Sequence, residues 1–375
     1  MKNLIYVICI IIILLVILLA IFSSYISLNT LAIIISLIAF ILTPTLLILT
    51  IISISKGNNK KINKEKILIK NENTDKFNKI YDKLYESHIK SLEELRKKAK
   101  REEIIKIVLL LSGFICCLVG EGYKSLGIVL IGFILLLISI YSFICLRSKR
   151  KYKEKYKKEI ISSFVKLVNN NLKYKLLEEE GDFLQREFIK SKIETHCFNR
   201  YNCTDYIEGK LTDNVFIKMV DIDVKNVTGS GRSRNVEQIF EGIFAVAKGN
   251  KNINGYVKIS RNNFIKNKKL SINMDSEEFE KSFDVLSENK ILAMQILTAD
   301  VMESLISFKK KYDIDFEIVL MNNKIYLRFF VSNMFEPQIF GNSMDKELIY
   351  TYYIILDFVV EITEKINKVI NDVNL

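Results

Sequence analysis

The sequence predicts an α-helical transmembrane region with four spans, arranged as two hairpins, followed by a cytoplasmic α+β domain with a mostly antiparallel sheet. No charged residue lies between Lys2 and Lys56, and only two interrupt the stretch between Lys106 and Arg147. Each of these apolar blocks is long enough for two membrane crossings, since one crossing takes about 20 apolar residues. After residue 159, short β-branched and aromatic runs lie between helical segments, which is typical of an α+β domain.

The first hairpin is expected within residues 1–55. Its spans are Leu4–Phe22 and Leu31–Ile54, and the second contains Pro44, which membrane helices tolerate. A cleaved signal peptide is the alternative, but a signal core has about 7–15 apolar residues and ends at a small-residue cleavage site. The first run is longer and another apolar run follows it, so an uncleaved anchor is predicted.

The connection between the two hairpins, residues 56–103, is expected to be a cytoplasmic loop with an amphipathic helix over Asp75–Glu103. Apolar residues recur there every three or four positions, with Lys and Glu between them. His88 falls on the apolar stripe and is interpreted as a packed side chain, since no other metal ligand accompanies it. The sequence leaves open whether this helix pairs with a second copy or packs on the C-terminal domain.

The second hairpin is expected within residues 104–146. Its spans are Ile104–Gly120 and Leu126–Leu146, and the connector between them is so short that the two helices must run antiparallel. Gly113 and Gly120 are small residues of the kind that let membrane helices approach closely.

Basic residues near the span ends predict the orientation. Residues 56–106 carry 16 Lys and Arg against 9 Asp and Glu, and residues 147–158 carry 8 against 1. The protein is therefore expected to be a multi-pass protein of the cell (cytoplasmic) membrane, with both termini and the C-terminal domain in the cytoplasm. The basic juxtamembrane segment 147–158 is also expected to contact anionic lipid headgroups. The residues predicted for this contact are Arg147, Lys149, Arg150, Lys151 and Lys153.

The C-terminal domain, residues 159–375, is slightly acidic, with 29 Lys and Arg against 32 Asp and Glu. Nucleic-acid binding needs a basic surface on the folded domain, so no nucleic-acid partner is predicted. Cys197 and Cys203 lie near His196, but a structural zinc site takes four ligands, commonly with cysteines two to four residues apart. No metal site, no other cofactor and no catalytic residue is therefore predicted.

Helices and strands alternate along the domain. Ile160–Glu180 is expected to be a helix that ends at Gly181. Thr228–Arg234 is expected to be a hairpin tip, because a phosphate-binding loop would need a helix after it. The four strands predicted in this half are Tyr206–Leu211, Val215–Val227, Val236–Ala247 and Gly255–Ile259.

The remainder of the domain is expected to contain a second hairpin and three helices. The hairpin arms, Ile314–Met321 and Lys324–Ser332, alternate in polarity around the turn signal Asn322-Asn323. The predicted helices are Ser276–Ser282, with Ser276 as its N-cap, Thr298–Tyr312 and the amphipathic Asp345–Val373.

The order and spacing of four blocks carry a resemblance to a known family. The blocks are Asp205–Gly209, Phe240–Phe244, Met274–Phe283 and Leu297–Leu305. From Phe188 to its end, the chain resembles a bacterial membrane-protein family catalogued as domain of unknown function thirty-one thirty-seven. The usual member has a proline where this chain has Ala299. The resemblance implies a membrane-anchored cytoplasmic domain without known activity or assigned catalytic residues, and a LemA-like membrane protein as partner, because members are often encoded beside LemA-type proteins.

The function favoured by these features is non-enzymatic. The chain is interpreted as an integral membrane protein of uncharacterised function whose cytoplasmic domain binds a partner protein or a small ligand. The alternative is a membrane-anchored enzyme, a hydrolase or lipid-modifying enzyme, that lacks a recognisable motif. A transporter is disfavoured because no ionisable residue lies deep in a predicted span. The expected partners are the lipid bilayer and the LemA-like protein, and a homo-oligomer stays open.

Overall fold

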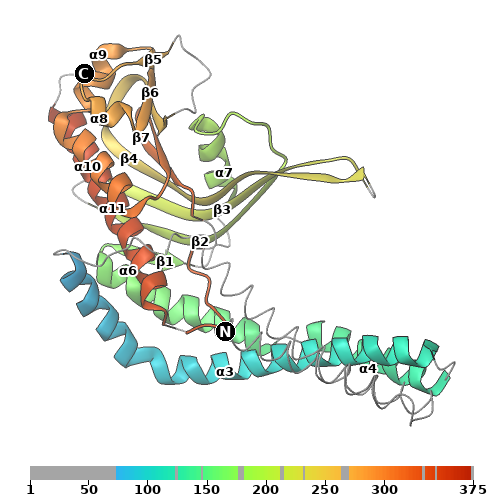
Figure 1. The fold of residues 1–375 in the computed structure, drawn as a ribbon. Coiled ribbons are helices and arrows are strands. Elements are labelled where there is room, and N and C mark those ends of the chain that lie inside the picture. Colours follow the sequence, from blue (N-terminus) through green and yellow to red (C-terminus); the bar gives the residue numbers. More distant parts are fainter. Residues whose placement is uncertain are drawn as a thin grey trace, which may run out of the picture. The chain divides into compact units, whose positions relative to one another are not determined.

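The computed structural model describes residues 73–122, 126–144, 147–175, 181–211, 215–230, 233–262, 270–331, 334–342 and 344–372 (Figure 1). The chain divides into two compact units. One contains Lys97–Lys149, and the other contains Arg150–Leu375 together with the preceding helix up to Arg96. The two spans expected within residues 1–55 lie outside the described residues.

The first unit contains the apolar helices of the second expected hairpin. Helix α3 (Asn73–Gly122) is continuous from the expected loop helix into the third span. Among the described residues, its part Leu92–Gly120 is the one helical segment long and apolar enough to cross a membrane. Helix α4 (Leu126–Ile144) qualifies only as a shorter apolar helix, over Leu130–Tyr141. The described chain thus supports one span by length and composition, and the prediction of four spans is not supported.

Helices α3 and α4 approach each other closely. A Cβ added at Gly113 would lie 2.9 Å from the carbonyl oxygen of Gly132. Toward the other end of the pair, the hydroxyl of Ser139 donates to the carbonyl of Lys106 at 3.2 Å. The later residue of α3 contacts the earlier residue of α4, so the two helices run antiparallel. The close approach at Gly113 is possible because glycine has no side chain, as the sequence predicted.

The chain enters the second unit as a run of helix that changes its winding. Helix α5 (Arg147–Lys155) continues into the π-helix η1 (Tyr156–Ile161) and then into α6 (Ser162–Val168). The predicted helix Ile160–Glu180 is wrong beyond Val168, because the next segment pairs with the sheet. The elements found there are strand β1 (Leu172–Lys175) and helix α7 (Gly181–Lys190), so that Gly181 begins a helix instead of ending one.

The sheet has seven strands, and every pair in it is antiparallel. Its order is β1-β2-β3-β4-β6-β5, with β7 paired to β4. The predicted antiparallel α+β domain is therefore confirmed. The remaining strand bounds are β2 (Arg200–Lys210), β3 (Phe216–Thr228), β4 (Asn235–Arg261), β5 (Ser271–Ile272), β6 (Phe283–Ser287) and β7 (Phe316–Phe329).

Strand β7 folds back on itself at Asn322, whose φ is 56°. The amide of Phe330 donates to the carbonyl of Asp315 at 3.0 Å, so the two ends of the strand lie together. The reversal expected at Asn322-Asn323 is therefore present. Strand β4 follows both arms, with Lys248 opposite Lys324 and Tyr256 opposite Met321, and so it also reverses. The two segments Val236–Ala247 and Gly255–Ile259, expected as separate strands, are its two arms.

Four helices complete the domain. The N-cap expected at Ser276 is present, since its side chain accepts from the Phe279 amide. Thr298, expected as the first residue of a helix, is the N-cap of that helix and accepts from the Val301 amide. A short helix capped by Asn289 was not expected. The helices are α8 (Glu277–Glu280), α9 (Lys290–Ile296), α10 (Ala299–Tyr312) and α11 (Lys346–Asp372).

The first part of α3 packs on this domain, which answers the question that the sequence left open. Phe77 is 0% exposed, and its ring centroid lies 4.9 Å from that of Tyr350 and 5.6 Å from that of Tyr353, both in α11. His88 lies at 3.7 Å from the carboxylate of Glu159, between Nδ1 and Oε2. The domain is therefore built from two chain segments, which the apolar part of α3 and helix α4 separate along the chain.

Candidate functional site

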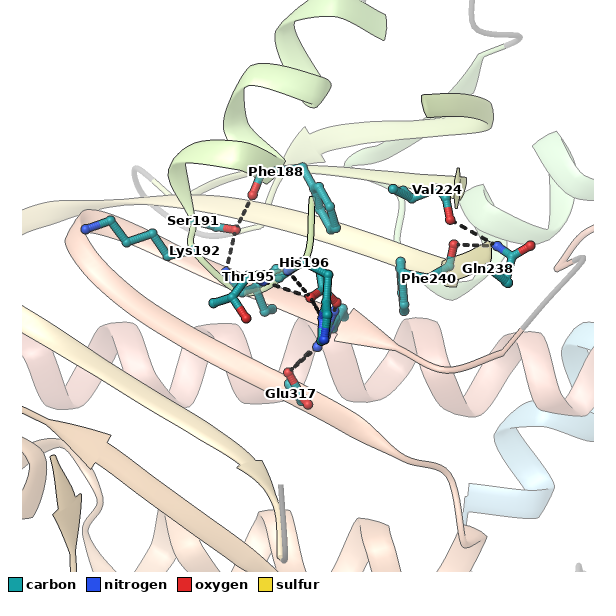
Figure 2. Close-up of polar contacts among 12 residues, drawn as sticks. Phe188, Ser191, Lys192, Thr195, His196, Val224, Gln238, Phe240 and Glu317 are labelled. Atoms are coloured by element: carbon teal, nitrogen blue, oxygen red, sulfur yellow. Dashed lines mark hydrogen bonds and ion pairs between the residues drawn. The ribbon is translucent and has the colours of Figure 1, made fainter. Parts of the chain in front are cut away.

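A cluster of charged side chains lies inside the second unit, on β4, β7 and the segment after α7. We call Glu194, His196, Lys258, Glu317 and Arg328 the sheet cluster. Figure 2 labels two of its members, His196 and Glu317. Arg328 is 1% exposed and donates from Nε to Glu317 Oε2 at 2.9 Å. Its Nη1 donates to Glu194 Oε2 at 2.7 Å. Glu317 and Arg328 lie on opposite arms of β7, which run side by side. The Arg328 guanidinium therefore links Glu317 to Glu194 in the segment after α7.

Glu194 is held by donors on both carboxylate oxygens. Its Oε1 accepts from the backbone amides of Thr195 at 2.8 Å and His196 at 2.9 Å, and lies 2.6 Å from His196 Nδ1. Burial alone would raise the pKa of Glu194, but the hydrogen bonds from Arg328 and His196 lower that pKa to about 2. The carboxylate is therefore ionised and fixes the imidazole, whose side chain is 61% exposed.

The other half of the sheet cluster is closed to solvent. Lys258 donates to the carbonyl of Ile193 at 2.9 Å, and its Nζ lies 3.6 Å from Glu317 Oε2. Burial lowers the pKa of Lys258, and the charge of Glu317 opposes that shift. The guanidinium of Arg328 also lies over the Phe240 ring, at 5.2 Å. Two buried acids face two buried cations, so the charges balance, but Glu317 Oε1 is buried without a hydrogen-bond partner among the described residues.

A second cluster lies where the juxtamembrane helices meet the sheet. We call Lys153, Lys157, Tyr174, Asp205, Asp221 and Glu336 the junction cluster. Lys157 Nζ lies 2.7 Å from Asp205 Oδ2 and 2.7 Å from Glu336 Oε1. Lys153 Nζ lies 2.6 Å from the other oxygen of Glu336. The hydroxyl of Tyr174 donates to Asp205.

The backbone around the junction cluster is unusual at three places. Asp205 has a φ of 54° and Phe335, next to Glu336, has a φ of 67°. A phenylalanine in this region is a genuine outlier. Lys157 lies in the π-helix η1, a form found mostly as single turns at functional sites. Strained backbone tends to gather at functional sites, so these features mark the junction cluster as the stronger candidate.

Asp221 is the exceptional member of the junction cluster. It is 8% exposed and lies in β3 opposite Thr204, the neighbour of Asp205 in β2. Burial and the charge of Asp205 raise the pKa of Asp221 to about 8, although Lys157 opposes the shift. At neutral pH this buried carboxyl is mainly protonated, so the cluster carries two lysine cations and two carboxylates.

The basic residues predicted to contact lipid have different surroundings in the structure. Lys149 Nζ lies 3.0 Å from Glu103 Oε1, and Lys153 is paired with Glu336. Arg150 Nε lies 3.6 Å from Glu154 Oε1 on the exposed side of α5, and Lys151 is exposed. The side chain of Arg147 lies outside the described residues. Lipid contact stays a prediction.

Among the described residues, Cys197 and Cys203 do not lie in a group of potential zinc ligands. Cys197 is exposed and Cys203 is half-buried, and both are free thiols. Within the described ranges, no group of three or more His, Cys, Asp or Glu side chains is arranged to hold a metal ion. His196 instead contacts Glu194.

Sequence reasoning missed both clusters, although one local signal was available. Glu317 and Arg328 each interrupt an apolar run, Phe316–Leu320 and Ile325–Phe330. A charge in the middle of a buried strand needs a partner. The partners of Arg328 lie 11 and 134 residues away, and no spacing rule connects them.

The comparisons with known proteins place part of this domain in a family. Residues 238–368 match the model of a family described as "Protein of unknown function (DUF3137)". The match confirms the resemblance over these residues, which hold Lys258, Glu317, Arg328 and Glu336. No curated protein and no solved structure matches the chain.

Proposed function

We propose that the protein is a multi-pass protein of the cell membrane, with four spans and a cytoplasmic C-terminal domain that binds a membrane-protein partner. The observation that carries this proposal is an arm formed by β3 and β4. Figure 1 shows the arm projecting beyond the rest of the sheet. The basic loops and the apolar helix of α3 support the membrane setting.

The arm is a two-stranded ribbon, and among the described residues its β4 edge has no further strand beside it. Pairing of β2 with β3 ends at Arg200 opposite Lys225, and pairing of β7 with β4 ends at Phe329 opposite Ile243. Beyond these points, the strand ladder in the described part of the chain joins β3 and β4 to each other alone, as far as Thr228 opposite Asn235. On the outer edge of β3, the Asn199 side chain accepts from the Val227 amide at 2.9 Å and donates to the Val227 carbonyl at 2.8 Å. An isolated two-stranded hairpin is marginally stable in water, and its free edges accept an added strand.

The surface of the arm fits an extended polypeptide better than a small molecule. Val236 is 48% exposed and lies opposite Val227, so the arm presents an apolar pair at its surface. A cleft between α10 and α11, lined by Phe308 and Asp357 among others, has a volume of about 140 Å³. Small-ligand pockets usually measure about 300–1,000 Å³. The occupant we propose for the arm is an extended segment of a LemA-like membrane protein.

Photocross-linking in intact membranes tests this assignment. A photoreactive residue at Val236 of the full chain is expected to form an adduct with the LemA-like protein. The same residue at Ile291, which is 70% exposed in α9, serves as the control and is expected to form none. An adduct with a second copy of the chain would assign the arm to a homo-oligomer and contradict the proposal, as would equal labelling at both positions.

A matched pair of substitutions sharpens the same test. Val236→Asp is expected to abolish the adduct formed from a neighbouring exposed position, Asn235, because it places a charge in the apolar contact. Glu237→Gln, one residue further along the strand, is expected to leave it unchanged. Loss of the adduct in both variants, or in neither, would show that Val236 is not part of the contact.

A second candidate function is a membrane-anchored hydrolase, and the pairing of Glu194 with His196 is the observation in its favour. A buried carboxylate that holds Nδ1 leaves the other ring nitrogen available as a general base. Hydrolysis of a nitrophenyl ester by the full-length protein, lost in His196→Ala but retained in Cys197→Ala, would support this function. Equal rates in the native chain and His196→Ala would exclude it.

A further inference from the structure

The outer edge of β3 in the arm is closed by one side chain. Asn199 precedes β2, and β2 lies on the side of β3 that faces away from β4. The Asn199 carboxamide donates to the Val227 carbonyl at 2.8 Å and accepts from the Val227 amide at 2.9 Å. The backbone amide of Asn199 also donates to the Lys225 carbonyl at 3.1 Å. Because it donates and accepts like a strand residue, this asparagine holds the place that an added strand would need.

The same bonds show which way the backbone of β4 points. In an antiparallel pair, successive residues direct their backbone N–H and C=O groups alternately toward the partner strand and away from it. Val227 directs both groups to Asn199, so Val227 and its cross-strand partner Val236 form a pair without hydrogen bonds between them. The N–H and C=O of Val236 therefore point to the opposite edge of the arm. Gln238, opposite Lys225, alternates in step and points the same way.

That opposite edge of β4 is where β7 binds farther along the strand. Pairing of β7 with β4 ends at Phe329 opposite Ile243. Within the described chain, the sheet has no strand beside Asn235–Gly242 on this side of β4. The side chains of residues 235–238 are exposed. An added strand would extend the row that β7 occupies, and it would meet the outward backbone groups of Val236 and Gln238.

We propose that an extended segment of the partner adds as a strand to the β4 edge of the arm, and that Asn199 excludes it from the β3 edge. This inference rests on the proposed function, which assigns a partner segment to the arm but does not choose an edge. The outward N–H and C=O of Val236 and Gln238 bind the backbone of the added strand, as in other complexes formed by strand addition. Asn199 is a positioning residue, because it leaves the arm with one edge that can accept a strand.

The side chains along the β4 edge define the kind of segment that fits. Asn235–Gly242 contains two acids, Glu237 and Glu241, and no lysine or arginine. Neighbouring residues of a strand lie on opposite faces, so an added strand places one residue beside Val236 and the next beside Glu237. Apolar pairs and pairs of opposite charge stabilise neighbouring strands. The segment that fits therefore alternates apolar residues with lysine or arginine.

Hydrogen–deuterium exchange at single-residue resolution tests which edge is used. The probe is a peptide that alternates valine and lysine over about eight residues, a usual strand length, added in excess to the full-length protein in nonionic detergent. Exchange of the Val236 and Gln238 amides is expected to slow about tenfold or more. Exchange of the Val227 amide, which Asn199 already binds, is expected to stay unchanged. The same peptide with methylated backbone nitrogens is the control and is expected to protect neither strand, because it cannot form the ladder.

Substitution of Asn199 gives an independent readout. In Asn199→Ala, the Val227 amide alone is expected to exchange about tenfold faster. The peptide is then expected to protect Val227 as well as Val236, because both edges are open. Asn254→Ala removes an exposed asparagine elsewhere on β4 and is expected to behave like the native chain. If Asn199→Ala leaves Val227 unprotected by the peptide, the asparagine does not close the β3 edge.

The native chain alone can overturn the inference, so the test holds even if Asn199→Ala does not fold. Protection of Val227 in place of Val236 would put the strand on the other edge. Equal protection by the methylated peptide would show that no ladder forms. No protection in a chain that still forms the Val236 adduct would refute strand addition while leaving the proposed function intact. If the adduct is absent too, the proposed function fails together with this inference.

Discussion

At the scale of single residues, the domain is notable for buried charges whose partners come from distant parts of the chain. Arg328 joins Glu317 across the β7 arms and Glu194 from the segment after α7. Removing one member of such a buried pair leaves an uncompensated charge, which costs about 3–5 kcal/mol. The sheet cluster therefore specifies how β7 and the segment after α7 fit together.

Because Glu194 is ionisable, the stability that it contributes to the domain depends on pH. Its pKa is lowered from 4.5 to about 2, so its stabilising effect is present above about pH 4.5 and is lost as pH falls through about 2. Glu194→Gln is expected to lower the free energy of unfolding by about 3 kcal/mol at neutral pH. The difference from the native chain should shrink in acid, as measured by thermal unfolding at several pH values. The exposed variant Glu277→Gln is the control. A difference that grows in acid would contradict the assignment.

At the scale of elements, Gly209 in β2 explains why the helix expected over Ile160–Glu180 ends at Val168. Strand β1 can pair with β2 only because residue 209 has no side chain. A Cβ at Gly209 would lie 2.2 Å from the carbonyl oxygen of Asn171. The helical spacing of Leu172 and Leu176 was read from local sequence, whereas the competing strand depends on a glycine far along the chain.

Gly209→Ala is expected to displace β1 and to destabilise the domain by about 1–3 kcal/mol, the usual cost of overpacking. Exchange protection of residues 172–175 should fall more than that of β7. Gly127→Ala is the control, because a Cβ there would meet no atom within 4 Å. Unchanged protection of β1 in Gly209→Ala would show that the backbone shifts without cost.

Helix α5 carries the predicted lipid contact on its exposed side. Because Lys149 and Lys153 are engaged with acids of the protein, Arg150 and Lys151 are expected to supply most of the attraction, at about 1 kcal/mol each. The double substitution Arg150→Glu with Lys151→Glu should reduce the anionic lipid that co-purifies with the protein, measured by mass spectrometry. Lys281→Glu and Lys310→Glu together are the control. Equal lipid content in both proteins would refute the contact.

At the scale of the whole molecule, the sequence predicted what depends on local pattern. It predicted the antiparallel α+β class, the cap at Ser276 and the reversal at Asn322-Asn323, because each depends on neighbouring residues. It did not predict the junction cluster, since Lys157, Asp205 and Glu336 come together only after the sheet forms. Nor could periodicity reveal that Phe77, before the second membrane hairpin, is buried against α11.

This division of the domain between two chain segments leads to a final prediction. A fragment of residues 150–375 lacks the part of α3 that covers Tyr350 and Tyr353, so it exposes apolar surface that the intact protein buries. Joining residues 73–96 to this fragment through a flexible linker is expected to raise its melting temperature by about 5–15 °C, since each kcal/mol shifts the midpoint by about 2–4 °C. The same joined helix with Phe77→Ala should recover less than half of that gain, because loss of a buried phenylalanine costs about 3–5 kcal/mol. If the fragment melts as a cooperative unit at the same temperature with and without the helix, α3 is not part of the folded domain.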